Sequence, residues 1–310
     1  MSKLSFNHLL NSNQIQESDI NQIFALADKY RATEHRKIIK DGDCYGYLLA
    51  TLFFEPSTRT RFSFEAAMQK LGGQVITLEQ GMSSSVKKGE SLEDMGRIIS
   101  SYADIIVMRH PEIGSVAKLA KYISVPVINA GDGANQHPTQ SLVDSYSIFC
   151  EKKRLDNLKI GLVGDLKYGR ANHSFLSLLS RYSTNHFVLI SHPSLALSDE
   201  QQKEFEKYGC QITQTTDLEG SVADLDVLMV SRIQQERFPD PTEYDKVKNI
   251  YCLTKKIVSK AKPDMVILHG LPRVNEIHTD VDDLPQAKYF KQVEYGLYIR
   301  MAILSLIKKC

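Results

Sequence analysis

The 310-residue sequence has almost no net charge, because 38 Lys and Arg side chains balance 37 Asp and Glu side chains to leave +1. This balance excludes a polybasic nucleic-acid binder, which needs an excess of cations to neutralise phosphates. It also excludes an acidic, disordered chain. With 42% hydrophobic and 24% charged residues, the composition is that of an ordinary globular protein, long enough for two domains of roughly 100–200 residues each.

Cysteines and long apolar runs are also scarce. The five cysteines are scattered, and the absence of CxxC pairs and of Cys/His ligand spacing argues against both a disulfide framework and a zinc site. We therefore expect a cytoplasmic protein without a metal. The first residues lack the continuous apolar region of a secretory signal, and no apolar run reaches the ~18 residues of a membrane span, so we expect no membrane association.

Short apolar runs alternate with segments of helical periodicity along the whole chain. Such alternation is typical of βαβ units, and its two successive series predict an α/β fold of two doubly wound parallel-sheet domains linked by helices. The predicted strands are 45–54, 74–78, 105–108, 125–129, 159–163, 187–191, 211–215, 227–231 and 265–269. The predicted helices are 61–71, 92–102, 116–122, 172–181, one that begins near residue 137, and 292–308. The pattern leaves open which domain the last helix joins.

Arginine is concentrated in the segments that follow the predicted strands. Ligands of open parallel sheets bind beyond the carboxyl ends of the strands, so these segments hold the candidate site residues. Seven of the 13 arginines lie there, namely Arg59, Arg61, Arg109, Arg170, Arg232, Arg237 and Arg273. Because a guanidinium binds carboxylates and phosphates with two hydrogen bonds at once, the pattern favours small anionic ligands. The alternative, that exposed loops are simply polar, predicts Lys and Glu there as readily as Arg.

Two of the segments that follow predicted strands have the pattern of a loop that opens a helix. The sequence PSTRTR at 56–61 follows a strand and opens a helix, whose first N–H groups and dipole attract phosphate. An ordinary Ser/Thr cap is the alternative, although these hydroxyls and guanidinium groups exceed what a cap needs. In the second segment, 132–140, His137 and Gln140 face the same side of a helix start, where His137 is a candidate either for catalysis or for structural hydrogen bonding.

Other phosphate- and nucleotide-binding motifs are missing. The Ser-rich segment 81–90 lacks the order GxxxxGK[ST], and its composition alone predicts a solvated loop. The segment 161–165 is similar to a Rossmann turn but lacks GxGxxG, and the next strand ends in Ser191-His192 instead of an acidic residue. A NAD-dependent oxidoreductase is therefore disfavoured.

The motifs PSTRTR at 56–61, HPTQ at 137–140 and HGLPR at 269–273, in this order, resemble those of the carbamoyltransferase family. The segments DLKYGR at 165–170 and RIQQER at 232–237 resemble its aspartate branch, and the SMG-type motif of the ornithine branch is not found. The resemblance covers nearly the whole chain. It implies transfer of a carbamoyl group from carbamoyl phosphate to L-aspartate in de novo pyrimidine synthesis, without a cofactor. Another acceptor amino acid, such as ornithine, is the alternative.

The resemblance also implies a domain organisation and partners. Residues 1–138 with 292–310 are expected to form a carbamoyl phosphate-binding domain, on which the C-terminal helix packs back, and residues 139–291 an aspartate-binding domain. Members of the family are trimers whose active sites are shared between subunits, so we expect a homotrimer. Regulatory chains and pathway enzymes are further candidate partners, whereas nucleic acid is not expected.

Residues of the first domain receive roles in binding carbamoyl phosphate from their positions in the family motifs. Those expected to hold the phosphate are Ser57, Thr58, Arg59, Thr60 and Arg109. Those expected to donate hydrogen bonds to the carbonyl oxygen, and so to be catalytic, are Thr60, Arg109 and His137. Gln140 and the carbonyl of Leu271, which precedes Pro272, are expected to orient the carbamoyl NH2 group. The family has proline where this chain has Gly270, which predicts a looser carbamoyl phosphate site, with neutral drift in a loop as the alternative. The Leu271–Pro272 bond is a candidate for the cis form.

The remaining motif residues are expected to bind aspartate or to favour domain closure. The aspartate carboxylates are assigned to Arg170, Arg232 and Gln234. Ser84 and Lys88 are expected to enter the site from the adjacent subunit, where Lys88 would contact aspartate and take part in catalysis. Glu55 is expected to pair with Arg170 and Arg237 and thereby to favour the closed state.

Overall fold

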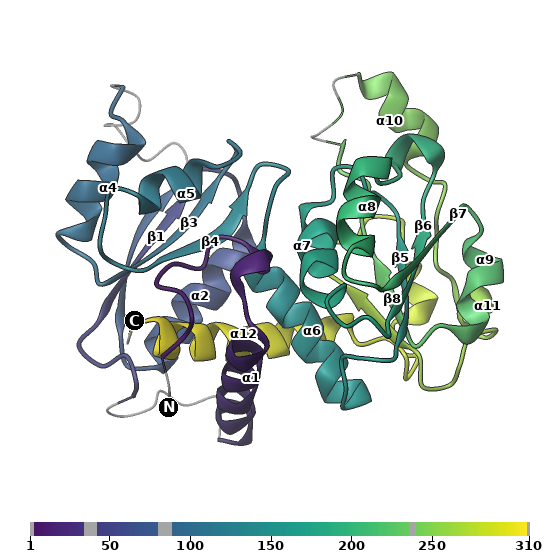
Figure 1. Cartoon of the computed structure of the whole chain (residues 1–310), viewed down its shortest axis with the longest axis horizontal. Helices are drawn as coiled ribbons and strands as arrows, with labels where there is room; N and C mark the ends of the chain where they lie inside the picture. Colours follow the sequence, from purple (N-terminus) through teal and green to yellow (C-terminus); the bar gives the residue numbers. More distant parts are fainter. Residues whose placement is uncertain (1–2, 34–41, 80–88, 236–237, 239, 309–310) are drawn as a thin grey trace. The chain divides into compact units, whose positions relative to one another are not determined.

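The computed structural model describes residues 3–33, 42–79, 89–235, 238 and 240–308 (Figure 1). The chain divides into two compact units, which are Met1–Val143 with Glu294–Cys310 (unit 1) and Asp144–Val293 (unit 2). Two helices, α6 (Pro138–Lys152) and α12 (Tyr289–Ile307), each begin in one unit and end in the other. Within the described residues, we find no helix with the length and apolarity needed to cross a membrane.

Unit 1 is built on a sheet of four parallel strands. They are β1 (Leu48–Phe53), β2 (Gln74–Glu79), β3 (Ile105–His110) and β4 (Val127–Asp132), in the order β2-β1-β3-β4. Its other elements are a 3-10 turn at Ser12–Gln14, α1 (Glu17–Ala32), α2 (Thr58–Lys70), α4 (Leu92–Ser100) and α5 (Ser115–Ala120). Met95 of α4 and Leu119 of α5 join Ala50, Ile106 and Met108 of the strands in one apolar cluster, which gives this face of the sheet its core.

The C-terminal helix α12 packs back on unit 1, as predicted. Near its end, Ser305 Oγ lies 2.7 Å from the Tyr30 hydroxyl of α1. One helical turn and a half earlier, the Arg300 guanidinium lies over the Phe64 ring of α2, 5.2 Å from its centroid. Helix α12 therefore packs against α1 and α2 in unit 1.

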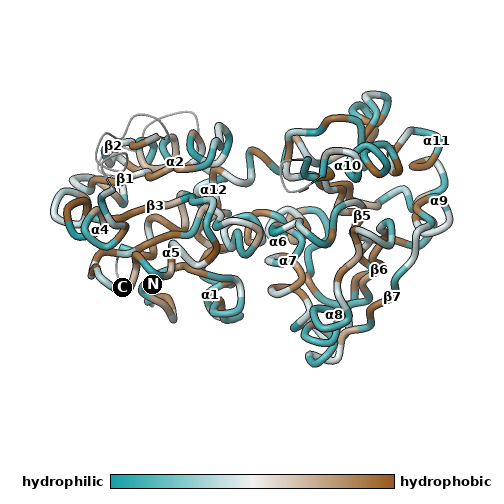
Figure 2. The backbone as a smooth tube through the Cα atoms, turned by 90° about the horizontal axis from the view of Figure 1, so that it is seen from above, coloured by the Kyte–Doolittle hydropathy of each residue, from teal (hydrophilic) through white to brown (hydrophobic). Residues whose placement is uncertain are grey.

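Unit 2 is built on a sheet of five parallel strands, and most of their residues are hydrophobic except in the polar edge strand at residues 211–215 (Figure 2). They are β5 (Lys159–Val163), β6 (His186–Ile190), β7 (Gln211–Thr215), β8 (Val227–Val230) and β9 (Val266–His269), in the order β7-β6-β5-β8-β9. Its helices besides α6 are α7 (Arg170–Leu179), α8 (Asp199–Glu206), α9 (Leu218–Ser221), α10 (Pro241–Val247) and α11 (Lys255–Val258). Short 3-10 turns lie at Pro193–Leu195, Val222–Asp224 and Thr279–Val281. This architecture confirms the predicted pair of doubly wound α/β domains.

Each sheet reverses its strand order once, and that reversal marks a ligand position. In unit 1 the chain adds β2 on one side of β1 and then β3 on the other. In unit 2 it adds β6 and β7 on one side of β5 and then β8 on the other. Loops that leave adjacent strands in opposite directions open a crevice between them at the carboxyl edge. The loops after β1 and β3, and those after β5 and β8, are therefore the places to look for a site.

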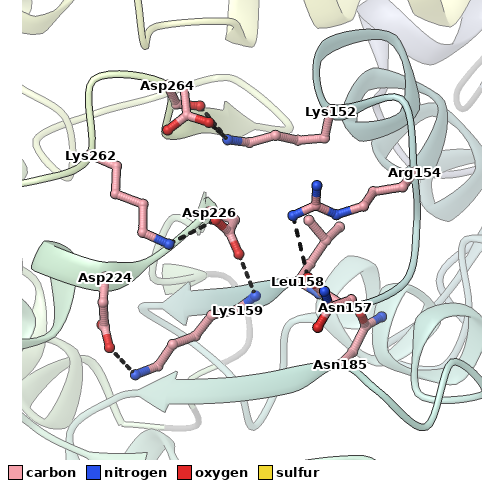
Figure 3. Close-up of polar contacts among 10 residues, drawn as sticks. All are labelled: Lys152, Arg154, Asn157, Leu158, Lys159, Asn185, Asp224, Asp226, Lys262 and Asp264. Atoms are coloured by element: carbon pink, nitrogen blue, oxygen red, sulfur yellow. Dashed lines mark hydrogen bonds and ion pairs between the residues drawn. The ribbon is translucent and has the colours of Figure 1, made fainter.

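Charged side chains form hydrogen bonds and ion pairs at the opposite, amino-terminal edge of the unit 2 sheet (Figure 3). The Asp226 carboxylate accepts hydrogen bonds from the Lys159 backbone N–H and from Lys262 Nζ, each at 2.8 Å. Lys159 Nζ in turn pairs with Asp224 at 2.5 Å. Lys152, only 6% exposed, pairs with Asp264 at 2.8 Å. These contacts join the starts of β5 and β8 to each other, to the end of α6 and to the segment that precedes β9.

Two aspartates of this cluster are expected to differ strongly in their effect on stability. The Asp226 side chain is 15% exposed and satisfies a backbone N–H, whereas Asp224 is 62% exposed. Asp226→Ala should lower the free energy of unfolding by about 1–3 kcal/mol, because it leaves the Lys159 N–H without its acceptor. Asp224→Ala should cost at most about 1 kcal/mol, as exposed ion pairs do. Urea unfolding of both variants checks this, and equal losses would contradict it.

Candidate active site

The loop after β1 places hydroxyl groups at the start of α2. Ser57 is the N-cap residue, and Thr58 and Arg59 lie exposed in the first turn, followed by the buried Thr60. The N–H groups of a first turn have no acceptor within their own helix, and the helix dipole adds partial positive charge at this end. The predicted phosphate loop therefore has the local structure that anion binding requires.

Arg109 lies beside this loop, near the end of the neighbouring strand β3. Its backbone is in register with Phe53 of β1, so its side chain leaves the same edge of the sheet. One guanidinium nitrogen donates to Glu55 Oε1 at 3.1 Å, a contact that the sequence did not predict. The predicted pairing of Glu55 with Arg170 and Arg237 remains a prediction, and Arg237 lies outside the described residues.

The adjacent His110 adds little charge to this edge. Burial lowers its pKa, and its Nδ1 accepts a hydrogen bond from the Glu112 N–H at 3.0 Å while the ring packs edge-on against Phe54. A neutral imidazole at this position leaves the positive charge of the edge to the arginines.

A buried aspartate shapes the loop that carries His137. One Asp132 oxygen accepts from the Asn129 side chain at 2.9 Å and the Gln136 N–H at 3.1 Å. The other accepts from the Gly114 N–H at 2.9 Å and the Asn135 side chain at 3.0 Å. With its four bonds this carboxylate fixes the backbone directly before His137. Sequence reasoning assigned Asp132 no role, although Asp followed by Gly, Ala and Asn is the composition of a tight, side-chain-bonded turn.

His137 itself lies at the start of α6. It is 6% exposed, and its Nδ1 lies 3.3 Å from the Thr139 hydroxyl. Its carbonyl accepts the backbone N–H of Gln140 at 2.9 Å, so the two predicted residues belong to one turn. The sheet register that pairs His110 with Asp132 brings this turn to the same edge as Arg109.

In unit 2 the loops after β5 and β8 are joined by a second buried aspartate. Asp165, fully buried, accepts the Tyr168 N–H at 2.9 Å through one oxygen and the Gln234 N–H at 3.3 Å through the other. The Gln234 side chain donates back to the Tyr168 carbonyl at 3.0 Å. Arg170, which begins α7, and Arg232 thus extend from loops that share one carboxylate. No role for Asp165 was predicted.

A pocket lies at this switch point. Among its lining residues are Gly164, Arg232, Lys248 and Glu276. Gly164 is required there, because its φ is 116° and an added Cβ would come within 2.2 Å of the Ser231 carbonyl oxygen. The predicted residues Ser84 and Lys88 lie outside the described residues.

The loop after β9 carries the HGLPR motif. The Leu271–Pro272 peptide bond is cis, as the sequence suggested, and Leu271 has a φ of 50°. Arg273 forms two hydrogen bonds to Asp282, one of them 2.6 Å long, and this guanidinium lowers the pKa of the Asp282 carboxyl. Around Gly270 there is open space, since an added Cβ would meet nothing within 4 Å. Within the described part of the chain, no three His, Cys, Asp or Glu residues are grouped to hold a metal ion.

Comparison with known proteins now identifies the family. Residues 7–149 match the model of the carbamoyl-P binding domain of aspartate/ornithine carbamoyltransferases, and residues 156–307 match that of the Asp/Orn binding domain. The chain belongs to the aspartate/ornithine carbamoyltransferase family. Its resemblance to carbamoyltransferases, predicted from the motifs, is thereby confirmed.

Relatives within the carbamoyltransferase family match the chain over almost its whole length. The aspartate carbamoyltransferase catalytic subunit of Leptospira biflexa is 48% identical over 302 residues, which is 97% of this chain and 96% of that protein. The crystal structure of the M. jannaschii aspartate transcarbamoylase catalytic subunit has a TM-score of 0.89 at 47% identity, covering 98% of this chain and 99% of that one. An aspartate transcarbamoylase from Trypanosoma cruzi, in complex with carbamoyl aspartate and phosphate, has a TM-score of 0.89 at 36% identity, covering 96% of this chain and 95% of that one.

Asp165→Asn tests whether the Asp165 carboxylate holds the loops after β5 and β8 together. An amide presents one acceptor and one donor, so one of the two backbone N–H groups at Tyr168 and Gln234 loses its acceptor. We expect the free energy of unfolding to fall by about 1–3 kcal/mol. We also expect the KM for the amino-acid substrate to rise more than the Kd for carbamoyl phosphate. Denaturant unfolding and steady-state kinetics measure the two effects, and an unchanged KM would contradict the joint role.

Proposed function

We propose that this chain transfers the carbamoyl group of carbamoyl phosphate to the amino group of L-aspartate, giving N-carbamoyl-L-aspartate and phosphate, in de novo pyrimidine synthesis. The observation that carries the proposal is the arrangement at the two switch points. A helix start rich in hydroxyls lies beside Arg109 in unit 1, and Arg170, Arg232 and Gln234 lie on loops joined by Asp165 in unit 2. The first suits a phosphate, and the second suits a dicarboxylate.

Most of the residues assigned to the first substrate, carbamoyl phosphate, belong to unit 1, whereas Leu271 and Pro272 belong to unit 2. The phosphate is held by the start of α2 and by Arg109, through Ser57, Thr58, Arg59 and Thr60. The carbonyl oxygen accepts hydrogen bonds from Thr60, Arg109 and His137. Gln140 and the Leu271 carbonyl orient the NH2 group, with Pro272 completing the loop. In support, Arg109 is fixed by Glu55 and His137 by the Asp132 turn, so these donors are oriented before the substrate arrives.

The reaction needs charge stabilisation more than acid–base chemistry. The neutral amine of aspartate attacks the carbamoyl carbon, and negative charge grows on the carbonyl oxygen. Donors fixed at that oxygen stabilise the transition state more than the ground state. The carbon–oxygen bond to phosphate then breaks, the departing phosphate takes the electron pair, and it accepts the proton that the amine must lose. We assign no side chain as general base, and a pH–rate profile that loses one limb on a single carboxylate substitution would refute this.

The second substrate is assigned to unit 2, with aspartate preferred to ornithine. Arg170, Arg232 and Gln234 bind its two carboxylates. The side-chain ammonium group of ornithine would meet guanidinium groups at this position, and like charges repel. The test is carbamoylation assayed with each amino acid at equal concentration. Activity with aspartate and little with ornithine supports the proposal, whereas a preference for ornithine would overturn the assignment of the acceptor.

We also propose a cytoplasmic homotrimer whose active sites are shared. Ser84 and Lys88 then come from the adjacent subunit, and Lys88 contacts aspartate. The family resemblance supports this, as do the relatives that are named catalytic subunits. The test is to mix two inactive variants, Lys88→Ala and His137→Ala, under conditions where subunits exchange. Mixed trimers regain activity if one site uses residues of two chains, and remain inactive if each chain is self-sufficient.

A further inference from the structure

A buried histidine–carboxylate pair lies under the loop after β9, and the proposed mechanism does not use it. His269, the last residue of β9, is 3% exposed. Its Nε2 lies 2.8 Å from Glu276 Oε1, and its Nδ1 lies 2.7 Å from the backbone nitrogen of Leu271. The imidazole therefore bridges a carboxylate and the residue whose carbonyl is assigned to the carbamoyl group.

These two contacts determine where the imidazole carries its proton. A backbone N–H can only donate, so Nδ1 of His269 must accept from Leu271 and carries no hydrogen. The hydrogen of the neutral ring is then on Nε2, where it is donated to Glu276. Any imidazole with a hydrogen on Nδ1, whether the other neutral form or the cation, would set two N–H groups against each other. The loop as folded thus requires one form of His269.

Glu276 also holds the far side of the same loop. Its second carboxylate oxygen accepts the backbone N–H groups of Val274 and Asn275, each at 3.0 Å. Burial by itself raises the pKa of Glu276, but the hydrogen bonds from His269 and the backbone outweigh it and leave the pKa below its ordinary value. An ionised carboxylate can accept all three hydrogen bonds at once. Glu276 therefore holds both ends of the loop 270–275. It binds the end of the loop directly and the start of the loop through His269.

The pair is itself anchored in the core of unit 2. The His269 backbone N–H donates to Gln292 Oε1 at 2.9 Å, and Gln292 Nε2 donates to Asp144 at 2.6 Å. Leu271, by contrast, has a φ of 50°, a conformation that L-residues seldom adopt and that needs outside support. The hydrogen bond to His269 provides such support at the nitrogen of Leu271.

We infer that His269 and Glu276 are positioning residues, which hold the Leu271 carbonyl in the orientation that binds the carbamoyl NH2 group. The inference rests on the proposed function for the role of that carbonyl. Neither residue is assigned a contact with carbamoyl phosphate. They act through the Leu271 N–H and through the two N–H groups after Arg273, and so determine how tightly carbamoyl phosphate binds.

The experiment compares the full-length chain with Glu276→Gln, using ¹⁵N-labelled histidine. Long-range ¹H–¹⁵N correlation reports which ring nitrogen carries hydrogen, and His269→Asn assigns the signal by its loss. We expect the Nε2–H form in the unaltered chain near neutral pH. In Glu276→Gln the amide oxygen stays with the backbone N–H groups and the NH2 faces the ring, so the hydrogen should move to Nδ1. A cation or an Nδ1–H form in the unaltered chain would overturn the inference without any variant.

Binding of carbamoyl phosphate in the absence of aspartate is the second readout. Loss of one hydrogen bond should weaken binding by about threefold to tenfold in Glu276→Gln. Glu276 lines the same pocket as Arg232, so its substitution is expected to alter the aspartate KM as well, and only carbamoyl phosphate binding is diagnostic. Asp280→Asn is the matched control, because it alters an exposed His278–Asp280 pair outside this loop and should leave binding unchanged.

The two conservative histidine variants separate positioning from mere packing. His269→Asn keeps an acceptor near the Leu271 N–H, whereas His269→Gln keeps a donor toward Glu276. Tighter carbamoyl phosphate binding in His269→Asn than in His269→Gln supports the inference, and tighter binding in His269→Gln would overturn it. Unchanged ring form and affinity in Glu276→Gln would overturn the inference alone. No binding by the unaltered chain would overturn the proposed function itself.

Discussion

Replacing His137 with alanine is expected to lower kcat by about 100- to 1,000-fold, the usual effect of removing one donor to a developing oxyanion. His137 is proposed to donate to the carbamoyl oxygen, where charge grows during attack. The turn built by Asp132 should survive the change, because its hydrogen bonds end at the Gln136 N–H and do not involve the imidazole. Steady-state kinetics at saturating carbamoyl phosphate and aspartate measure the effect.

The division of this effect between kcat and binding is diagnostic. An interaction made mainly in the transition state lowers kcat and leaves ground-state binding less changed. Carbamoyl phosphate affinity should therefore fall much less than kcat. His186→Ala is a suitable control, because His186 bonds only to the edge-strand residue Thr213 among the contacts described for its ring. A loss in His137→Ala that is confined to substrate affinity would contradict the catalytic role.

Replacing Arg232 with alanine is expected to raise the aspartate KM by about 10- to 100-fold, the range for losing hydrogen bonds to a charged group. Arg232 follows β8 and lines the pocket at the switch point of unit 2. Arg232→Lys should recover only part of the loss, because an ammonium group cannot bind a carboxylate in the two-pronged manner of a guanidinium. Initial rates at varied aspartate concentration provide the measurement.

A matched arginine in the same unit serves as control for this prediction. Arg154 lies at the amino-terminal edge, where it donates to the Asn157 carbonyl at 3.4 Å (Figure 3). Arg154→Ala should leave the aspartate KM unchanged. If Arg232→Ala instead weakens carbamoyl phosphate binding as much as aspartate binding, Arg232 does not recognise the second substrate selectively.

The strands could be predicted from the sequence because most of them are buried along nearly their whole length. β3, β5 and β8 contain short, continuous apolar runs at residues 105–108, 160–163 and 227–230. Each predicted strand is present within three residues of its expected ends. The helices α8 and α10 were not predicted. Both are largely polar, and α8 buries only Phe205, so their sequences carry little periodicity.

The helix α1 was also not predicted, although its sequence has the apolar spacing of a helix. Its buried residues Ile20, Ile23, Phe24 and Ala27 have the three- and four-residue spacing of a helix face. The many polar residues of α1 make this spacing less apparent than the apolar runs of the strands. Attention to periodicity alone would have found it.

The motifs located the loops of the candidate site, but not the groups that hold those loops. Asp132, Asp165 and Glu276 act on backbone N–H groups, and any residue can supply such a donor. Asp165 and its partner Gln234 are 69 positions apart, a distance over which residue spacing carries no information. Such partners emerge only once the strand order places the loops after β5 and β8 side by side.

The carboxylate shared by the loops after β5 and β8 limits how this enzyme can be re-engineered for another acceptor amine. Exchanging the loop with Arg232 and Gln234 alone would leave Asp165 facing a foreign backbone. An unmatched hydrogen bond at a fully buried carboxylate costs about 1–3 kcal/mol, a large share of the stability of a typical domain. Side-chain substitutions at residues 232 and 234 keep this backbone N–H, whereas a loop exchange that alters the backbone path at residue 234 requires joint replacement of the two loops.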